Sequence, residues 1–344
     1  MSAAVAQPEG AGRPVAGFLA PGRLGFGGAA LANLFAPVAE EDAMAAVAAA
    51  LACGVRHLDT APYYGYGLSE ARLGRALAQV PHTGVTVSTK VGYVLDPQLA
   101  REAGPLFVGD VPDLGVGFDY GRASVQRSLE HSLARLGLAR VGALLVHDLD
   151  PTVHRDDAAF ERHVEVAMAE GWPVLRELRR DGLTDAIGFG LNHVGAARRL
   201  IASSDPDLLL LAGRYTLLDH EEALPLLEAC ARRGIAVMIG GPFNSGILAS
   251  GTGPGAMYDY APPDGFVRDR VAALEQACAR HGVPLAAAAL WFAFGQPAVV
   301  KVIPGMRSAA EVARNAALLE RRPPAALWDE LRERGLIAAG APTP

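Results

Sequence analysis

Lysine is scarce in this chain of 344 residues: only Lys90 and Lys301 are lysines among its 31 basic residues, and the others are arginines. A basic excess is also lacking, because 37 acidic residues give a formal net charge of −6. Proteins that bind nucleic acids present clustered Lys and Arg to the phosphates. We therefore exclude nucleic acid as the main partner.

Cysteine is rare as well, and Cys53, Cys230 and Cys278 lie scattered in Ala- and Leu-rich patterns. This spacing argues against a disulfide framework or a metal site and predicts three buried apolar side chains. The most apolar stretches, Ala43–Cys53 and Leu285–Phe294, are shorter than the roughly 18–20 residues that cross a bilayer. The N-terminus lacks the charge and apolar core of a secretory signal, so we expect a cytoplasmic protein without a membrane partner.

Apolar stretches of strand length alternate with longer helical patterns along the chain. Hydrophobic residues make up 51% of the sequence, and most of the short stretches are apolar on both faces, as in a covered parallel sheet. We expect strands at Arg23–Gly27, Val55–Ala61, Thr86–Gly92, Gly142–His147, Ala186–Leu191, Leu208–Tyr215, Ala236–Gly240 and Ala298–Pro304. We expect the main helices at Glu40–Cys53, Ser69–Val80, Arg122–Leu136, Ala159–Asp181, Val194–Ala202, Glu221–Arg233, Gly265–His281 and Ser308–Leu319.

This alternation of eight strands and eight main helices predicts an α/β fold, a single (β/α)8 TIM barrel, with an extra helix at Pro284–Phe294. A doubly wound sheet is the structural alternative. We expect the barrel to occupy residues 21–335, between a flexible N-terminal segment, 1–20, and a C-terminal tail, 336–344.

Three long segments follow strands, on the face where barrel enzymes carry their active sites. They are Leu95–Asp119, Asp148–Arg155 and Ser250–Gly265. We expect them to be long loops on that face, since loops of such length are usually functional or disordered.

Side chains suited to proton transfer stand at three consecutive strand ends: Asp59 with Tyr64 shortly after it, then Lys90, then His147. Lysine is a compact charge whose pKa shifts on burial, whereas arginine stays protonated, so Lys90 marks a position where that difference matters. An ammonium beside Tyr64 would lower the pKa of the phenol and prepare it for proton transfer. Asp59 would neutralise that ammonium, and His147 would orient a substrate oxygen.

Each of these residues also has a structural alternative. Asp59 could cap a turn, Tyr64 could be a rim aromatic with Tyr63 as its rival, and His147 could be a core histidine. Lys301 lies inside an apolar strand, where it could simply pair with a carboxylate, and we assign it no role. The joint pattern at three strand ends favours a catalytic site.

These residues lie in motifs that resemble the aldo-keto reductase family, over roughly Arg23 to Leu319. The matching motifs are Asp59-Thr-Ala-x-x-Tyr64-Gly65 followed by Ser69-Glu70, then Ser88-Thr-Lys90, and Arg122–Gly137 leading to His147-Asp148. The resemblance implies a (β/α)8 barrel, a nicotinamide cofactor (NAD or NADP) extended across the rim, and a catalytic tetrad. Residue by residue, that tetrad falls on Asp59, Tyr64, Lys90 and His147.

The resemblance places the cofactor contacts late in the chain. Asn192 would bind the carboxamide, although the serine that often precedes it is not evident, and Ala212 stands where the family has a glutamine. Arg307 could pair with a 2′-phosphate, which would favour NADP, or be a solvated arginine, so the preference stays open. The implied pyrophosphate and adenosine contacts are Gly241, Phe243, Asn244, Ser245, Gly246, Gly305, Arg307, Glu311 and Asn315.

A glycine-rich segment near the N-terminus, Gly25–Ala30, fits Gly-x-Gly-x-x-Ala, but it lacks the helix start and the distant acidic residue that a Rossmann fingerprint needs. By the family resemblance this turn lines the cofactor cleft instead.

Within the family, three segments resemble the branch that contains L-fucose dehydrogenase (D-threo-aldose 1-dehydrogenase) and pyridoxal 4-dehydrogenase. They are Ala212–Leu218, Gly241–Leu248 and Tyr258–Pro262. The implied reaction oxidises the C1 hydroxyl of an aldose to a lactone by hydride transfer to NAD(P)+, with Tyr64 as acid and base. The alternatives are pyridoxal oxidation, a general aldehyde or ketone reductase, and a non-enzymatic cofactor binder like the channel β subunits.

The partner that this function implies is a small-molecule sugar or aldehyde. Tyr64, His147 and Trp172 are the candidate substrate contacts, and Trp172 has a helix-packing role as its alternative. Asp148 and Asn192 are further loop residues whose positions bear on sugar recognition. The sequence leaves the oligomeric state open, a homo-oligomer included.

Overall fold

The computed structural model describes residues 22–101, 106–154 and 156–344, so the expected N-terminal segment 1–20 lies outside it. In these residues, eight parallel strands form one sheet in the order β1-β2-β3-β6-β7-β8-β9-β10. They are β1 (Phe26–Gly27), β2 (His57–Asp59), β3 (Thr86–Val91), β6 (Val141–His147), β7 (Thr184–Leu191), β8 (Leu208–Ala212), β9 (Ala236–Gly240) and β10 (Val299–Ile303).

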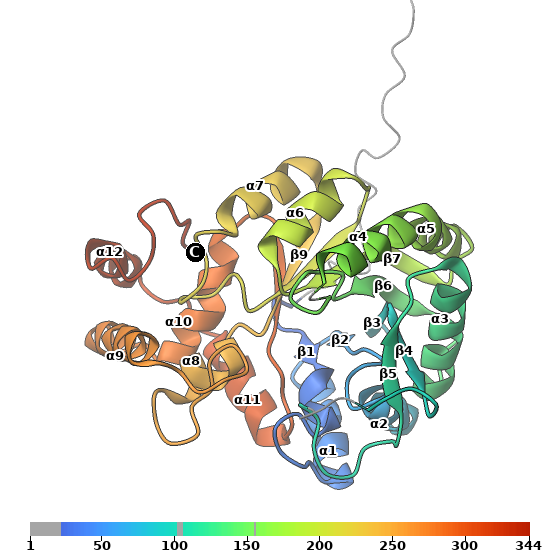
Figure 1. Cartoon of the computed structure of the whole chain (residues 1–344). Coiled ribbons are helices and arrows are strands. Elements are labelled where there is room, and N and C mark those ends of the chain that lie inside the picture. The colour runs from blue at the N-terminus through green and yellow to red at the C-terminus, as the bar shows by residue number, and fades with distance from the viewer. Residues whose placement is uncertain (1–21, 102–105, 155) are drawn as a thin grey trace, which may run out of the picture.

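The first and last strands meet and close this sheet. The amide of Gly25 donates to the Val302 carbonyl at 2.8 Å, and the amide of Gly27 donates to the Pro304 carbonyl at 2.9 Å. The helices form a ring outside the strands (Figure 1). The predicted TIM barrel is therefore confirmed, and each of its strands overlaps a segment that the sequence marked.

The helices outside the strands pack their apolar faces against the barrel or against neighbouring helices. They are α1 (Glu40–Ala52), α2 (Leu68–Gln79), α3 (Arg122–Leu136), α4 (Asp157–Val166), α5 (Trp172–Arg180), α6 (Val194–Ala202), α7 (Leu224–Arg233), α8 (Ile247–Ser250), α9 (Gly265–Arg280), α10 (Leu285–Phe292), α11 (Ala309–Leu318) and α12 (Ala325–Glu333). The barrel interior holds a separate apolar cluster, which includes Leu145, Leu208 and Met238.

The single helix expected at Ala159–Asp181 is interrupted by a wider π turn, Ala167–Gly171, between α4 and α5. Pro173 at the start of α5 lacks the amide proton that a regular α-helical bond requires. A side chain at Gly171 would also stand 2.4 Å from the Tyr120 carbonyl oxygen, so the chain needs glycine there.

The segment Leu95–Asp119, which we expected to be a loop, instead contributes to a two-stranded hairpin. Strand β4 (Tyr93–Asp96) pairs antiparallel with β5 (Gly115–Phe118), and the hairpin lies beside α3 (Figure 1). The alternating pattern that predicts strands is short here, and Gly115 and Gly117 interrupt it. In a segment rich in Gly and Pro, such a pattern does not indicate a hairpin.

Glycines near the N-terminus serve close packing and not a Rossmann turn. Strand β1 has two residues and leads directly into the 3-10 helix Gly28–Ala32. A side chain at Gly28 would stand 2.7 Å from the carbonyl oxygen of Asp59 and from Ser69 Oγ. The glycine therefore lets this turn approach the end of β2.

The C-terminal segment 336–344 packs on the barrel after α12, a helix that the sequence did not reveal. The amide of Ala338 donates to His220 Nε2 at 3.0 Å, and Arg332 Nη2 donates to Thr343 Oγ1 at 2.6 Å. Ile337 and Ala341 are buried.

Two of the three cysteines are buried as predicted, Cys230 and Cys278, but the prediction for Cys53 is wrong. Cys53 follows α1 at its C-terminal cap, where the helix end faces solvent. Lys301 is buried in the barrel and donates a hydrogen bond to the Gly22 carbonyl at 2.7 Å.

Over the described residues, no individual helix has the length and apolar character needed to span a bilayer. Two segments, Gly265–Arg280 and Leu285–Gly295, meet those criteria only when taken together, and they meet at a 99° bend.

A buried ion pair joins α2 to α3. The Glu70 carboxylate is 0% exposed and accepts from Arg135 Nε at 2.7 Å, and Thr89 Oγ1 on β3 donates to it at 2.5 Å. Because an isolated charge is costly to bury, Arg135 holds a carboxylate that would otherwise oppose folding.

Replacing Arg135 by Ala should lower the free energy of unfolding by about 3–5 kcal/mol, because Glu70 is then a buried charge without a cation. Arg140→Ala is the matched control, since Arg140 pairs with Asp185 on the surface and both side chains are about half exposed. That loss should stay within about 1 kcal/mol. Urea unfolding of both variants checks this, and equal losses would contradict it.

Candidate active site

Lys90 is the centre of a group of polar side chains at the carboxyl ends of β2 and β3. Its Nζ donates to Asp59 Oδ2 at 2.8 Å, to the Thr60 carbonyl at 2.8 Å and to Tyr64 Oη at 3.1 Å. An ammonium has three protons, so these bonds use all of them. The side chain is 1% exposed, which makes this ion pair with Asp59 a buried one.

The stem of Lys90 fits against a glycine on β7, two strands along the sheet from β3. A side chain at Gly190, on β7, would stand 3.2 Å from Lys90 Cε. Little space is left around the stem, and the larger, flat guanidinium of an arginine does not suit it. The structure thus gives a steric reason for a lysine in an arginine-rich chain.

Asp59 is held by a second bond that the sequence motifs do not indicate. Ser88 Oγ donates to Asp59 Oδ1 at 2.5 Å, and His57 Nε2 lies 3.1 Å from the same hydroxyl. Burial lowers the pKa of His57 to about 3, so this histidine is neutral. Alternation along a strand could have revealed Ser88, since it lies two residues before Lys90 on the same face.

Tyr64, and not Tyr63, is the tyrosine that bonds the ammonium. Its pKa lies well above the ordinary value, because burial disfavours the phenolate and the Asp59 charge disfavours it further. We expected Lys90 to lower this pKa, and in the protein alone that is wrong. The physical reason is the burial of the phenol, which is the largest cause of the raised pKa, followed by the charge of Asp59.

His147 lies at the end of β6 and faces Tyr64, with 5.7 Å between the ring centroids. Burial lowers its pKa well below the ordinary value, and the Lys90 charge adds to this effect. The imidazole is therefore neutral. Its Nδ1 is buried and has no hydrogen-bond partner among the described residues, while Nε2 lies 3.6 Å from Asp148 Oδ2.

A further tyrosine, Tyr93, joins the site from the hairpin β4–β5, which the sequence pattern did not indicate. Its hydroxyl donates to Asp148 Oδ2 at 2.9 Å, and its ring stacks on Tyr63 at 4.3 Å. A pattern of Lys90, then Gly92, then an aromatic residue carries no specific signal for this role, so only the fold reveals it.

The expected cofactor residues follow the tetrad around the same rim. Asn192 comes after β7, the segment Gly241–Gly246 after β9, and Gly305–Asn315 after β10. Because β7 to β10 are consecutive in the sheet, these segments and the tetrad share the carboxyl-terminal face. Phe243, Asn244 and Asn315 are buried, whereas Gly305 and Arg307 are exposed.

Two of these side chains hold neighbouring loops in place. Asn244 Nδ2 donates to Asp219 Oδ2 at 2.9 Å, and Ser245 Oγ accepts from the Tyr260 amide at 3.0 Å. Arg214 adds a third support, because its Nε donates to the Asn192 carbonyl at 2.6 Å and its Nη2 pairs with Asp259. The loop Tyr258–Pro262 is thereby tied over this side of the rim.

Trp172 does not join the tetrad. Its ring stacks on Phe189 at 4.9 Å, and its Nε1 donates to Asp205 at 3.0 Å. Gly190 faces Lys90 inside the barrel, so Phe189 points outward by strand alternation, and Asp205 precedes β8 at the opposite end of the barrel. Trp172 therefore packs a helix against the sheet, far from the rim at which we expected it to contact substrate.

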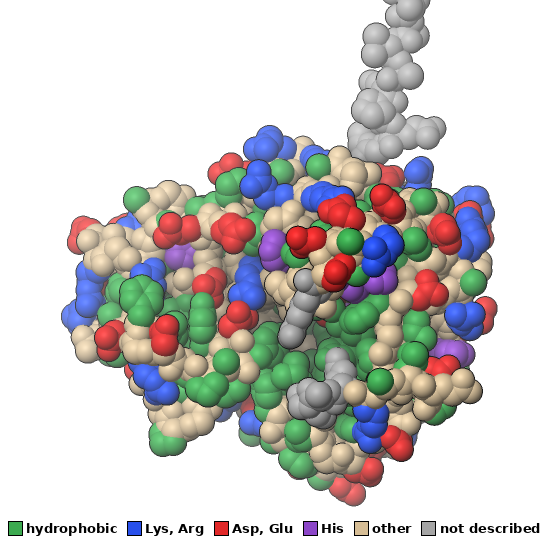
Figure 2. Space-filling view, viewed as in Figure 1, with side chains coloured by type: hydrophobic (Ala, Val, Ile, Leu, Met, Phe, Trp, Pro, Cys, Tyr) green, Lys and Arg blue, Asp and Glu red, His purple; other side chains and the backbone are tan. Residues whose placement is uncertain are grey.

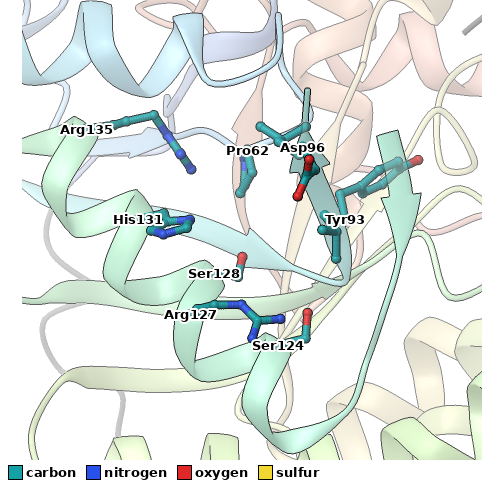
Figure 3. Close-up of a pocket in the computed structure, with 10 residues that line it drawn as sticks. Pro62, Tyr93, Asp96, Ser124, Arg127, Ser128, His131 and Arg135 are labelled. Carbon is teal, nitrogen blue, oxygen red and sulfur yellow. The ribbon is translucent and has the colours of Figure 1, made fainter. Parts of the chain in front are cut away.

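The middle of the rim is hollowed, and mostly hydrophobic side chains line it (Figure 2). A separate cavity of about 240 Å³ lies between the hairpin and α3, and Tyr93 forms part of its wall. The Tyr93 hydroxyl points away from the Arg127 and Ser128 side of that cavity (Figure 3). Tyr93 therefore borders the α3 cavity and, with its hydroxyl, contacts Asp148 beside the tetrad.

Comparison with known proteins agrees with this geometry. The model of the aldo/keto reductase family matches residues 23–334. A D-threo-aldose 1-dehydrogenase from Pseudomonas sp. is 37% identical, with 93% of this chain and 95% of that protein covered. A pyridoxal 4-dehydrogenase from Microbacterium luteolum is 36% identical, with 92% and 94% covered.

The fold also resembles that of solved structures. A glycerol dehydrogenase from Gluconobacter oxydans has a TM-score of 0.71 and 20% identity, and the match covers 94% of this chain and 93% of that one. At this identity the match supports the fold alone. The family match over most of the chain, together with the two relatives, shows that this protein is an oxidoreductase and belongs to the aldo/keto reductase family.

Proposed function

We propose that this protein oxidises the C1 hydroxyl of an aldose to the lactone, with NAD+ or NADP+ as hydride acceptor. The observation that carries the proposal is the bond between Lys90 Nζ and Tyr64 Oη at 3.1 Å, next to the Asp59 carboxylate and opposite His147. The activity of the D-threo-aldose relative supports the substrate class. The similarity to pyridoxal 4-dehydrogenase, at 36% identity, keeps pyridoxal oxidation as a second candidate.

The residues along the rim fit an extended dinucleotide. Asn244 Oδ1 is buried without a hydrogen-bond partner among the described residues. Side chains added at Gly213 or Gly246 would meet nothing within 4 Å, so the loops after β8 and β9 leave open space there. Exposed backbone amides at such glycine-rich turns suit a pyrophosphate. Asn192 would hold the carboxamide, and the segment Gly305–Asn315 would hold the adenosine.

The bound nicotinamide supplies the hydride acceptor for oxidation and the hydride donor for reduction. Oxidation of the aldose breaks the C1–H and O1–H bonds and forms the C1=O bond of the lactone. We assign the O1 proton to Tyr64, whose phenolate Lys90 stabilises by its hydrogen bond. In reduction Tyr64 gives the proton back to the oxygen. The neutral imidazole of His147 orients the same oxygen.

The adenosine end bears on the choice of nucleotide. Arg307 Nε lies 3.3 Å from Glu311 Oε1, and its backbone amide donates to Oε2 at 2.9 Å. A carboxylate already neutralises the arginine that could bind a 2′-phosphate, and it would repel that phosphate. We therefore propose NAD+ as the preferred acceptor.

The proposed activity is tested by incubating the protein with L-fucose, L-galactose, D-arabinose and pyridoxal, each with NAD+ and with NADP+, and following nucleotide reduction. We expect turnover of at least one aldose and faster turnover with NAD+. Oxidation of pyridoxal without any aldose would establish the second candidate instead. Faster turnover with NADP+ would contradict the role given to Glu311.

Tyr64→Phe should lower turnover by about 10²–10⁴-fold, because it removes the proton carrier. The affinity for the nucleotide, measured by fluorescence titration, should stay within about twofold. Tyr63→Phe is the matched control, because the ring of Tyr63 stacks on Tyr93 and this contact does not need the hydroxyl. Loss of activity in Tyr63→Phe with retention in Tyr64→Phe would reverse the assignment.

The two lysines allow a second matched comparison. Lys90→Met should reduce turnover at least about 100-fold, since the phenolate then lacks its stabilising ammonium. Lys301→Met removes the bond to the Gly22 carbonyl and should lower stability while leaving turnover per folded molecule unchanged. Steady-state kinetics with a melting curve on each variant separates the two effects. Similar turnover in both variants would count against a catalytic role for Lys90.

A further inference from the structure

Asp148 follows His147 directly and has an unusual backbone conformation. Its φ is 47°, in the left-handed region, and its amide donates to the Gly190 carbonyl at 2.9 Å. Residues other than glycine adopt this region rarely, although asparagine and aspartate do so more often than most, and such conformations concentrate at functional sites. The side chain is only 11% exposed. The chain therefore bends sharply after His147 and keeps a carboxylate beside the tetrad.

The carboxylate of Asp148 is held in one position. Tyr93 Oη donates to Oδ2 at 2.9 Å, and the Tyr93 ring packs between Tyr63 at 4.3 Å and Phe118 at 4.8 Å. Because the tyrosine is fixed on both sides, its hydroxyl fixes the carboxylate. The hairpin β4–β5 thus positions an acid that lies outside the tetrad.

The second oxygen of this carboxylate, Oδ1, has no donor among the residues that the structure describes. The ion-pair partner of Asp148 there is the neutral His147, so no arginine or lysine in the described ranges neutralises the acid by direct contact. Enclosed carboxylates nearly always have hydrogen-bond donors. An acceptor that the protein leaves open beside the reacting groups suits a donor on the substrate.

The position of Asp148 indicates which group of the substrate would donate a hydrogen bond to its carboxylate. Its Oδ2 lies 3.6 Å from His147 Nε2, and His147 faces Tyr64. In the proposed function, the reacting oxygen lies between Tyr64 and His147. An oxygen on the neighbouring carbon is within hydrogen-bonding distance of the reacting oxygen, and it would therefore be close to Asp148.

We propose that Asp148 accepts a hydrogen bond from the hydroxyl on the carbon next to the reacting carbon, and so selects 2-hydroxy aldehydes and their cyclic forms, the aldoses. This rests on the proposed function for the position of the reacting oxygen. Substrate specificity is thereby assigned to Asp148, on the loop after β6, and to Tyr93 of the hairpin, whose hydroxyl holds that carboxylate in place.

The surroundings of Asp148 make this recognition depend on pH. Burial raises the pKa of Asp148 to about 7, and the charge of Asp150 contributes, while the Tyr93 hydroxyl and Lys90 act in the opposite direction. The ionised acceptor is therefore present above about pH 7 and is lost below it. The titratable groups that face Asp148 are Tyr64, Lys90, Tyr93, Tyr120, His147, Asp150, His154 and Tyr260.

Three aldehydes isolate the proposed contact: 2-hydroxypropanal, 3-hydroxypropanal and propanal, each reduced with NADH. The wild-type enzyme should favour 2-hydroxypropanal, because only it has a hydroxyl next to the carbonyl. Asp148→Asn should lower kcat/KM for 2-hydroxypropanal about 10- to 100-fold, as expected for loss of a hydrogen bond to a charged group. The values for the other two aldehydes should change less than about threefold.

Asp96→Asn is the matched control. It makes the same change of charge as Asp148→Asn, but at a residue of the hairpin that lines the α3 cavity (Figure 3). It should leave the preference unchanged. The wild-type preference for 2-hydroxypropanal should rise with pH through about 7. Asp150→Asn should shift this midpoint to lower pH, because the charge of Asp150 raises the pKa of Asp148.

Two results would overturn the proposal: a wild-type enzyme that does not favour 2-hydroxypropanal, or an Asp148→Asn variant that loses all three aldehydes equally. Melting curves and NADH titration establish that the variant is folded. The aldehyde comparison does not require any sugar to be oxidised. If no sugar is oxidised but Asp148→Asn still loses activity selectively toward 2-hydroxypropanal, the proposed aldose oxidation is refuted. The role proposed for Asp148 then stands.

Discussion

The buried pair of Lys90 and Asp59 is the constraint on which the rest of the site depends. Two charges removed from water cost several kcal/mol each unless every proton and lone pair is satisfied. The barrel meets this condition with Thr60, Ser88 and Tyr64 around the pair. The arrangement that we propose to be catalytic is therefore also the one that satisfies the buried pair, and Tyr64 takes part in both.

The hairpin β4–β5 holds a loop residue in place beside the buried pair. Through Tyr93 it connects the loop after β3 with the loop after β6, which holds Asp148. The barrel alone would place the ends of these strands near each other, but the loop conformation after His147 would stay undetermined. Catalytic groups come from strand ends in this fold, and in the role proposed for Asp148 the hairpin orients the group that discriminates between substrates.

Much of the fold and the tetrad followed from local patterns. Strand length, apolar faces and the positions of Asp59, Lys90 and His147 at strand ends were visible because each depends on a few adjacent residues. The contact of Tyr93 with Asp148 joins residues 55 positions apart and has no local pattern. The expected substrate role of Trp172 failed for a related reason, because sequence spacing does not show which end of a barrel a side chain reaches.

The scarcity of lysine has a consequence for the chemistry of the surface. Both lysines are enclosed by the barrel, with 1% of Lys90 and 3% of Lys301 exposed. The folded protein consequently offers no lysine amine to acylating reagents, to acetyl transfer or to cross-linkers that join neighbouring amines. Acylation of Lys90 or Lys301 itself would therefore report that the barrel has opened.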